Sequence, residues 1–161
     1  HGLIDLVTDP ADGLLVIQNR GRVDAVGVQL TAERLWDNGY KARGSYSHQH
    51  AKDADSGAWL TNSPRHLAKL NVVTPEIALG IRAGLEAQYT STRKTTFGTT
   101  AGNTVFNLTL RRPGIARGLD LCASVYNLFD QAYADPMAAE LTRGGVDTIQ
   151  QDGSTWRVGL E

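Results

Sequence analysis

Hydrophobic and polar residues alternate along most of this chain, in segments long enough to be β-strands. From Val26 to Trp36, the even-numbered residues are apolar apart from Arg34, and the odd-numbered residues are polar or glycine apart from Leu35. A period of two places the two kinds of side chain on opposite faces of a strand, whereas helical spacing fits these segments poorly. The pattern predicts an all-β chain with antiparallel pairing.

Eight strands are predicted in this way. They are Leu3–Val7, Leu14–Trp36, Tyr40–His50, Ala68–Val72, Ile81–Thr90, Phe106–Arg111, Leu119–Tyr126 and Trp156–Leu160. Within the second strand the apolar parity is lost around Arg20-Gly21, which indicates a β-bulge because one extra residue shifts the parity. The dipeptide Asn38-Gly39 between the second and third strands is a strong hairpin signal.

After the first connection, the connections between the predicted strands alternate between short and long. The short ones are Asp37–Gly39, Thr74–Glu76 and Pro113–Gly118, and the long ones are Ala51–His66, Ser91–Asn103 and Gln131–Gly153. Outer-membrane barrels have short turns on the periplasmic side and long loops outside. This asymmetry favours an antiparallel up-and-down transmembrane β-barrel. A soluble antiparallel sandwich with one solvated face would show the same alternation strand by strand and is the alternative.

Aromatic residues support the membrane interpretation. Trp36 and Tyr40 flank the first short turn, and Tyr46 and Tyr89 lie near the ends of strands that run towards the long loops. Barrels in membranes carry such aromatic residues at both interfaces.

Composition excludes several classes of protein. The 161 residues have a formal net charge of −1, which argues against a strongly basic nucleic-acid-binding surface. The longest apolar run is Leu14–Ile17, which is too short for a transmembrane helix. One cysteine, Cys122, cannot form an intramolecular disulfide or a multi-cysteine zinc site. The chain starts with His and without a signal segment, so we expect a processed chain or a piece of a longer one.

No catalytic pattern stands out, and we expect neither an enzyme nor a cofactor. His48 and His50 share one strand face, but two imidazoles without a third ligand are insufficient to predict a metal site. The candidates for ligand contacts are therefore loop residues, because binding residues concentrate on loops held by a rigid scaffold. They are Trp59, Arg93, Lys94, Tyr133 and Arg143. The pair Arg93-Lys94 could attract an anionic ferric chelate or lipopolysaccharide phosphate, or be a solvated pair, and Trp59 could instead pack on its own loop. Asp135-Pro136 predicts one capped helical turn over Met137–Leu141 in the last long loop.

Several segments resemble a known family. Val125–Tyr133 reads V-Y-N-L-F-D-Q-A-Y, which resembles the N-L-F-D-x-x-Y signature near the C-terminus of TonB-dependent outer-membrane receptors. Further segments resemble the family in the same order: Leu3–Val7, Gln18–Val23 followed by Gly27–Leu30, Asn62–Leu70 and Trp156–Leu160. The chain departs from the pattern at Gln29, usually Glu in the family, and lacks the terminal aromatic residue, the plug domain and the TonB box.

The resemblance implies that residues 1–161 are the C-terminal part of the barrel, with about eight of its roughly 22 strands. It implies a Gram-negative outer membrane, transport of a scarce chelate such as a ferric siderophore, and energy supplied through TonB. The implied partners are outer-membrane lipid, the rest of the barrel with its plug domain, TonB and a small chelate, with no nucleic acid. The resemblance makes Asn127, Leu128, Phe129, Asp130 and Tyr133 a structural motif. The alternative is a complete eight-stranded barrel with a structural or adhesive role.

Overall fold

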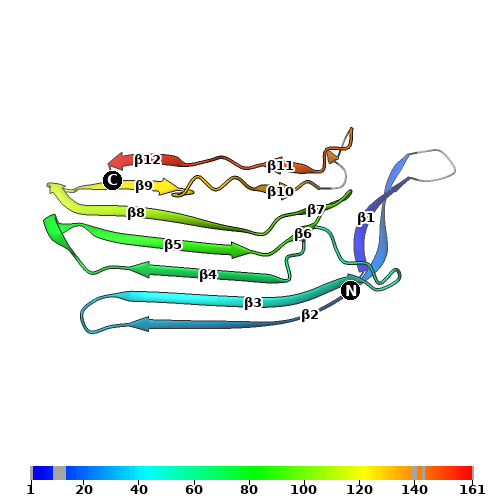
Figure 1. Cartoon of the computed structure of the whole chain (residues 1–161), viewed down its shortest axis with the longest axis horizontal. Coiled ribbons are helices and arrows are strands. Elements are labelled where there is room, and N and C mark those ends of the chain that lie inside the picture. Colours follow the sequence, from blue (N-terminus) through cyan, green and yellow to red (C-terminus); the bar gives the residue numbers. More distant parts are fainter. Residues whose placement is uncertain (1, 9–13, 139–140, 143, 161) are drawn as a thin grey trace.

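The computed structural model describes residues 2–8, 14–138, 141–142 and 144–160. Eight strands form one antiparallel sheet in the order β1-β2-β3-β4-β5-β8-β9-β12, in which neighbours in the chain are neighbours in space (Figure 1). Their bounds are β1 Gly2–Thr8, β2 Leu15–Leu35, β3 Lys41–Asp53, β4 His66–Val73, β5 Arg82–Thr90, β8 Asn103–Ala116, β9 Leu119–Tyr126 and β12 Thr155–Leu160. The predicted all-β antiparallel class is confirmed.

Two small hairpins that the sequence did not predict lie in the long connections. One pairs β6 (Arg93–Lys94) with β7 (Thr99–Thr100), and the other pairs β10 (Ala134–Pro136) with β11 (Thr148–Gln150). A 3₁₀ turn spans Ala78–Gly80. Among the described residues, no helix has the length and apolar character needed to cross a membrane.

The strand register separates two faces of the sheet, as the alternation predicts. One row of directly paired residues runs Leu30, Tyr46, Ala68 and Tyr89. Positions of the other parity, three residues away on each strand, form the row Glu33, Arg43, Asn71, Glu86 and Asn107 on the opposite face. Directly paired residues of an antiparallel sheet share a face. We call these the apolar face and the polar face.

Both faces of the sheet are open. Val26 is 73% exposed and Leu30 64% on the apolar face, and on the polar face Glu33 forms an ion pair with Lys41 at 2.8 Å. Where burial is described, at residues 14, 22–138, 141–142 and 144–160, Ala51 is the only aliphatic or aromatic residue other than proline that is buried. A soluble domain of this length would bury an apolar core. The exposed apolar face instead requires an apolar environment outside the chain.

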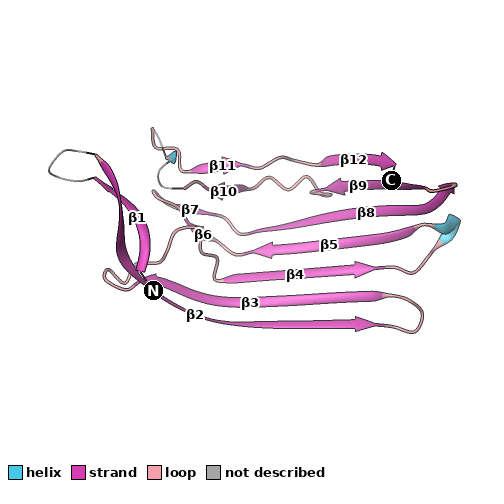
Figure 2. Ribbon diagram, turned by 180° about the vertical axis from the view of Figure 1, so that it is seen from behind, coloured by secondary structure: helices cyan, strands magenta, loops and turns pink. Residues whose placement is uncertain are grey.

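The short and long connections gather at opposite ends of the sheet, on the left and the right in Figure 1. The view from behind in Figure 2 shows the same separation. One predicted short turn is shorter than expected, since β8 continues through Pro113 to Ala116 and leaves only residues 117–118 as the turn. The register shifts between Arg112 and Ala116, which indicates a bulge, where a proline without an N–H is tolerated.

The long strand β2 bends away from the sheet at the end with the long connections (Figure 1). Gly2 pairs with Arg22 but Ile4 with Asn19, which places an extra residue at positions 20–21, where the parity shift predicted a bulge. β1 pairs only with residues 15–22 of β2. Residues 23–35 therefore have a described partner strand on one side only, and β1 and β12 lie at opposite edges of the sheet.

Candidate functional site at the loop end of the sheet

Three long connections meet at one end of the sheet. Residues 54–65 join β3 to β4, residues 91–102 join β5 to β8, and residues 127–154 join β9 to β12. The second and third are stiffened by the hairpins β6–β7 and β10–β11. All of the predicted ligand candidates lie in these connections, which therefore form the candidate site.

The turn after β9 is organised by the side chain of Asn127. Its amide nitrogen donates to the carbonyl oxygens of Gln131 at 3.0 Å and Asp152 at 3.2 Å, and its amide oxygen accepts from the N–H of Gln131 at 2.9 Å. Asn127 is 5% exposed and has φ 51, a left-handed conformation that asparagine tolerates better than most residues. One side chain thus ends β9 and holds the segment that leads into β12.

Asp130 supplies the second half of this connection. Its carboxylate accepts from the N–H of Ser154 at 2.8 Å, at the start of β12. A Cβ atom at Gly153 would collide with the same carboxylate oxygen, so the close approach requires glycine. Phe129 of the same turn packs on Phe106 at the apolar face, with ring centroids 5.1 Å apart in an edge-to-face arrangement. The N-L-F-D segment therefore contacts both faces and ties β9, β8 and the start of β12 together.

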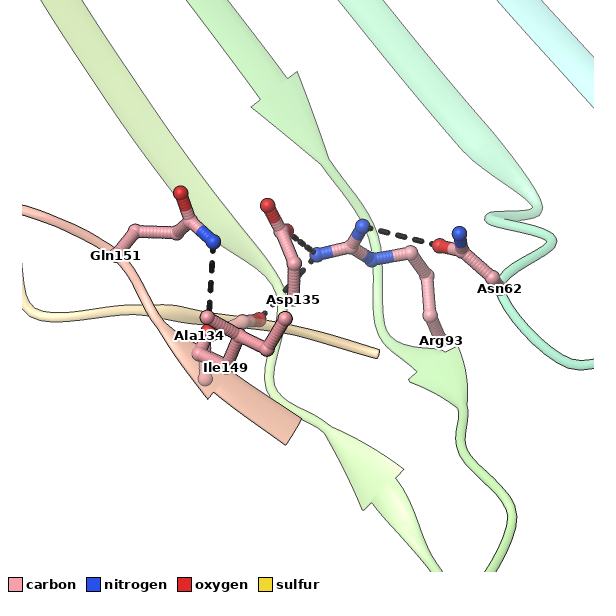
Figure 3. A network of polar contacts seen from close by, with 6 residues as sticks. All are labelled: Asn62, Arg93, Ala134, Asp135, Ile149 and Gln151. Atoms are coloured by element: carbon pink, nitrogen blue, oxygen red, sulfur yellow. Dashed lines mark hydrogen bonds and ion pairs between the residues drawn. The ribbon is translucent and has the colours of Figure 1, made fainter. Parts of the chain in front are cut away.

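The guanidinium group of Arg93 joins all three long connections (Figure 3). It donates to the amide oxygen of Asn62 at 3.2 Å, to the carbonyl oxygen of Ala134 at 3.3 Å, and to the carboxylate of Asp135, with which it forms an ion pair. The Arg93 side chain is 10% exposed, so these charge-assisted bonds are shielded from water. Arg93 is a clamp between loops rather than a free surface cation.

A polar cavity of about 460 Å³ lies beside this clamp on the polar face. Its walls come from β5, β8, β9 and β12 and from the two later loops. The side chains that line it include Gln88, Arg93, Asn103, Asn107, Tyr133, Asp135 and Gln151. Partial burial and the nearby Asp135 carboxylate raise the pKa of Tyr133 above its ordinary value of 10.0, at which the phenol is already protonated and able to donate at neutral pH.

The structure separates four of the five predicted ligand candidates into two groups. Arg93 and Tyr133 line the polar-face cavity. Trp59 and Lys94 line a different groove, whose wall includes Tyr89 of the apolar face. Arg93 and Lys94 are consecutive residues of β6 and therefore point to opposite sides. Arg143 lies outside the described residues.

The predicted helical turn after Asp135-Pro136 is not capped by Asp135. Residues 134–136 are strand β10, paired with β11, and the Asp135 carboxylate binds Arg93. The N–H of Leu141 donates to the carbonyl oxygen of Ala138 at 3.0 Å, and residues 139–140 of the predicted turn lie outside the described residues. Asp135 pairs with Arg93 instead of capping the turn, so the ion pair prevails over the capping preference of aspartate.

The sequence did not identify Asn62, Asp135 or Gln151 as parts of this site. Asn62 lies 31 residues from Arg93, and Asp135 lies 42 residues from it. Of these three residues, only Asn62 could have been suspected from its residue type, because asparagine accepts a positive φ such as the 53° found here. His48 and His50 lie on the apolar face, and the described residues contain no group of three or more His, Cys, Asp or Glu placed to hold a metal ion.

A pH-sensitive contact joins the second and third loops. The carboxylate of Asp147 accepts a hydrogen bond from the N–H of Phe97 at 2.7 Å. The pKa of Asp147 is lowered mainly by a hydrogen bond from the Thr95 hydroxyl and, to a smaller extent, by the bond from Phe97. Because the pKa is lower in the folded loop than in the free chain, the contact stabilises the loop at neutral pH. It is lost as the pH falls through the lowered pKa.

We therefore expect ¹⁹F NMR of a fluorinated Phe97 in the intact protein to report a transition centred below 3.8, the ordinary pKa of an aspartate. Asp147→Asn should abolish this transition, since the amide does not titrate. A transition centred above 3.8, or one that survives in Asp147→Asn, would show that another group controls the loop.

Comparisons with known proteins bear on all of these features. The family model described as "TonB dependent receptor-like, beta-barrel" matches residues 2–128. None of the curated proteins with which the chain was compared is significantly similar to it.

Several solved structures have the same fold. The ferric-catecholate import receptor Fiu of Escherichia coli K12 is 20% identical with a TM-score of 0.72, over 97% of this chain and 23% of that one. FpvA of Pseudomonas aeruginosa, bound to a heterologous pyoverdine and iron, is 15% identical with a TM-score of 0.74, over 99% and 22%. The copper transporter OprC is 20% identical with a TM-score of 0.71, over 89% and 24%.

The chain spans less than a quarter of the length of each of these structures. The family model covers most of the chain, and the sheet order, the two-faced register and the end-to-end asymmetry agree with it. This chain belongs to the TonB-dependent receptors, a family of outer-membrane transporters, and is part of their β-barrel.

Proposed function

We propose that the chain is the C-terminal part of the barrel of an active transporter in a Gram-negative outer membrane, and that the intact receptor takes up a scarce chelate, a siderophore-like ferric complex. The apolar face would contact membrane lipid, and the polar face would face the lumen and the plug domain. TonB would supply the energy. Fiu is a ferric-catecholate import receptor and FpvA binds a pyoverdine with iron, which supports this choice of cargo, whereas the copper transporter OprC makes copper the nearest competitor.

The observation that carries the proposal is the polar cavity beside Arg93, where three long connections converge on the polar face. Its wall offers a protonated phenol and several amides as donors for the oxygen atoms of a chelate, beside the paired charges of Arg93 and Asp135. Among the predicted ligand residues we retain Arg93 and Tyr133 for this cavity, and Arg143, outside the described residues, stays a predicted ligand contact. Asn127, Leu128, Phe129, Asp130 and Tyr133 remain the proposed structural motif that places the third loop.

The alternative, a complete eight-stranded barrel, is disfavoured by the sheet itself. A closed barrel pairs its first strand with its last. Here β1 and β12 occupy opposite edges, and the registers of the described residues contain no pairing between them.

The test uses the intact receptor in cells limited for iron. We expect uptake of ⁵⁵Fe presented as catecholate, hydroxamate or pyoverdine complexes to depend on TonB and on the cavity. Tyr133→Phe, which removes one donor, should lower the affinity for the transported complex about fivefold to tenfold. Tyr40→Phe at the short-turn end is the matched control and should leave uptake unchanged. Uptake of no iron complex, with uptake of copper instead, would contradict the ferric assignment.

A further inference from the structure

A groove of about 680 Å³ lies at the loop end of the sheet beside the apolar face. Tyr89 and His66 belong to its wall, and the register places them on the apolar face, since Tyr89 pairs with Ala68 and His66 with His48. This groove is therefore on the other side of the sheet from the polar cavity. It takes no part in the proposed path of the chelate.

The aromatic side chains at the floor of the groove are held in place by contacts with their neighbours. Trp59 forms a bridge with Lys52 and packs against the ring of His50, with centroids 4.1 Å apart. The guanidinium carbon of Arg65 lies 3.5 Å from the centroid of the Trp59 ring. The hydroxyl of Tyr46 and Nδ1 of His66 are 2.7 Å apart, so this imidazole is also held in place.

The chemistry of the lining is cationic and rich in hydroxyl groups. Arg65 and Lys94 line the groove, and Lys52 lies beside it with its amino group 5.1 Å from the centroid of the Trp59 ring. Among the described residues, no Asp or Glu lines the groove. Its small polar residues are Ser63, Ser91, Thr92 and Thr99. Cations and hydroxyls without a carboxylate favour an anion with several oxygen atoms, such as a phosphate ester.

The groove is also continuous with the apolar face. Tyr89 is shared by the two, and Leu70 and Leu85 follow on the same face towards the short-turn end, 45% and 37% exposed. A molecule with its acyl chains along this face would place its headgroup beside Arg65 and Lys94. The cationic lining of the groove and its continuity with the apolar face together favour a lipid over a soluble anion.

We propose that this groove binds the phosphate-bearing headgroup of an outer-leaflet lipid, with Arg65 and Lys94 contacting the phosphate and Trp59 and Tyr89 lining the boundary with the acyl chains. The proposal takes only the membrane orientation of the sheet from the proposed function. It assigns Trp59 and Lys94, two of the predicted ligand contacts, to the lipid, and so takes the lipid alternative for Lys94.

The test measures lipid binding by the purified full-length receptor in detergent, by native mass spectrometry, with diphosphorylated lipid A as the probe. The double variant Arg65→Gln/Lys94→Gln should weaken binding at least tenfold. The matched control Lys69→Gln/Arg82→Gln removes the same charge from the polar face of β4 and β5 and should stay within twofold. Raising the salt concentration should weaken binding of the parent protein but not of the groove variant.

Three results would overturn the proposal. Dephosphorylated lipid A could bind as tightly as the diphosphorylated form, inorganic phosphate could compete at equal concentration, or the two double variants could lose affinity equally. A further single variant, Trp59→Leu, keeps both cations. It should weaken lipid A binding while leaving the salt dependence intact. Because the assay contains no transport step, failed uptake would not affect its outcome.

Discussion

Replacing Asn127 with alanine is expected to lower the free energy of unfolding of the intact receptor by about 3–5 kcal/mol. The substitution removes three hydrogen bonds to backbone groups of the turn and of the segment before β12. It also leaves alanine at φ 51, which costs about 1 kcal/mol more than asparagine there. Urea unfolding in detergent micelles, followed by tryptophan fluorescence, would measure the loss.

Asn71→Ala is the matched control for this variant, since Asn71 lies on the polar face of β4, away from the turn. It should change the unfolding free energy by no more than about 0.5 kcal/mol. Asn127→Asp should fall between the two, because it keeps the acceptor oxygen and loses the two donated bonds. Equal losses for Asn127→Ala and Asn71→Ala would show that the turn does not depend on this side chain.

Replacing Arg93 with alanine should loosen the three long loops, which would then be joined mainly by the bond from the Asn62 N–H to the Lys94 carbonyl and by that from the Phe97 N–H to Asp147. The variant loses the bonds to Asn62, Ala134 and Asp135 and leaves the Asp135 carboxylate without its cation. We expect amide hydrogen exchange in residues 54–65 and 131–138 to accelerate at least tenfold. The affinity for the transported chelate should fall by a similar factor, since loops that must be ordered on binding bind more weakly.

Lys94→Ala removes a cation from the same strand but from its other side, and in detergent without lipid it should leave the exchange of both segments unchanged. Arg93→Lys keeps the charge but loses the planar fork, so it should restore only part of the protection. If Lys94→Ala accelerates exchange as much as Arg93→Ala, the loops are coupled through the backbone of β6 instead of the guanidinium group.

The strands, their two faces and the bulge in β2 were predictable from sequence because each rests on a local rule. A period of two along Val26–Trp36 fixes which side chains share a face, and a break in that period at Arg20-Gly21 marks the extra residue. The continuation of β8 through Pro113 was missed because a proline suggests a turn when its neighbours across the sheet are unknown.

At the loop end, the candidate residues could be predicted from sequence, but not the contacts between them. Arg93 and Lys94 look equivalent in the sequence, and only the pairing of β6 with β7 assigns them to opposite sides. The partners of Arg93 lie 31 and 42 residues away, with no periodic pattern to connect them. Contacts between loops depend on where the sheet places the loop ends, and that information is not local.

The sequential order of the strands also sets the order in which they can assemble. Most neighbours in the sheet are joined by short segments, and β8 and β9 by residues 117–118 alone, whereas β9 and β12 are separated by residues 127–154. Closing the longer connection costs about 2 kcal/mol more in chain entropy than closing the two-residue turn. The bonds that Asn127 and Asp130 make to residues 152–154, with the β10–β11 hairpin, shorten that connection before β12 docks. From this chain entropy we expect β12 to be the slowest strand of the sheet to pair, and the N-L-F-D turn to speed its pairing.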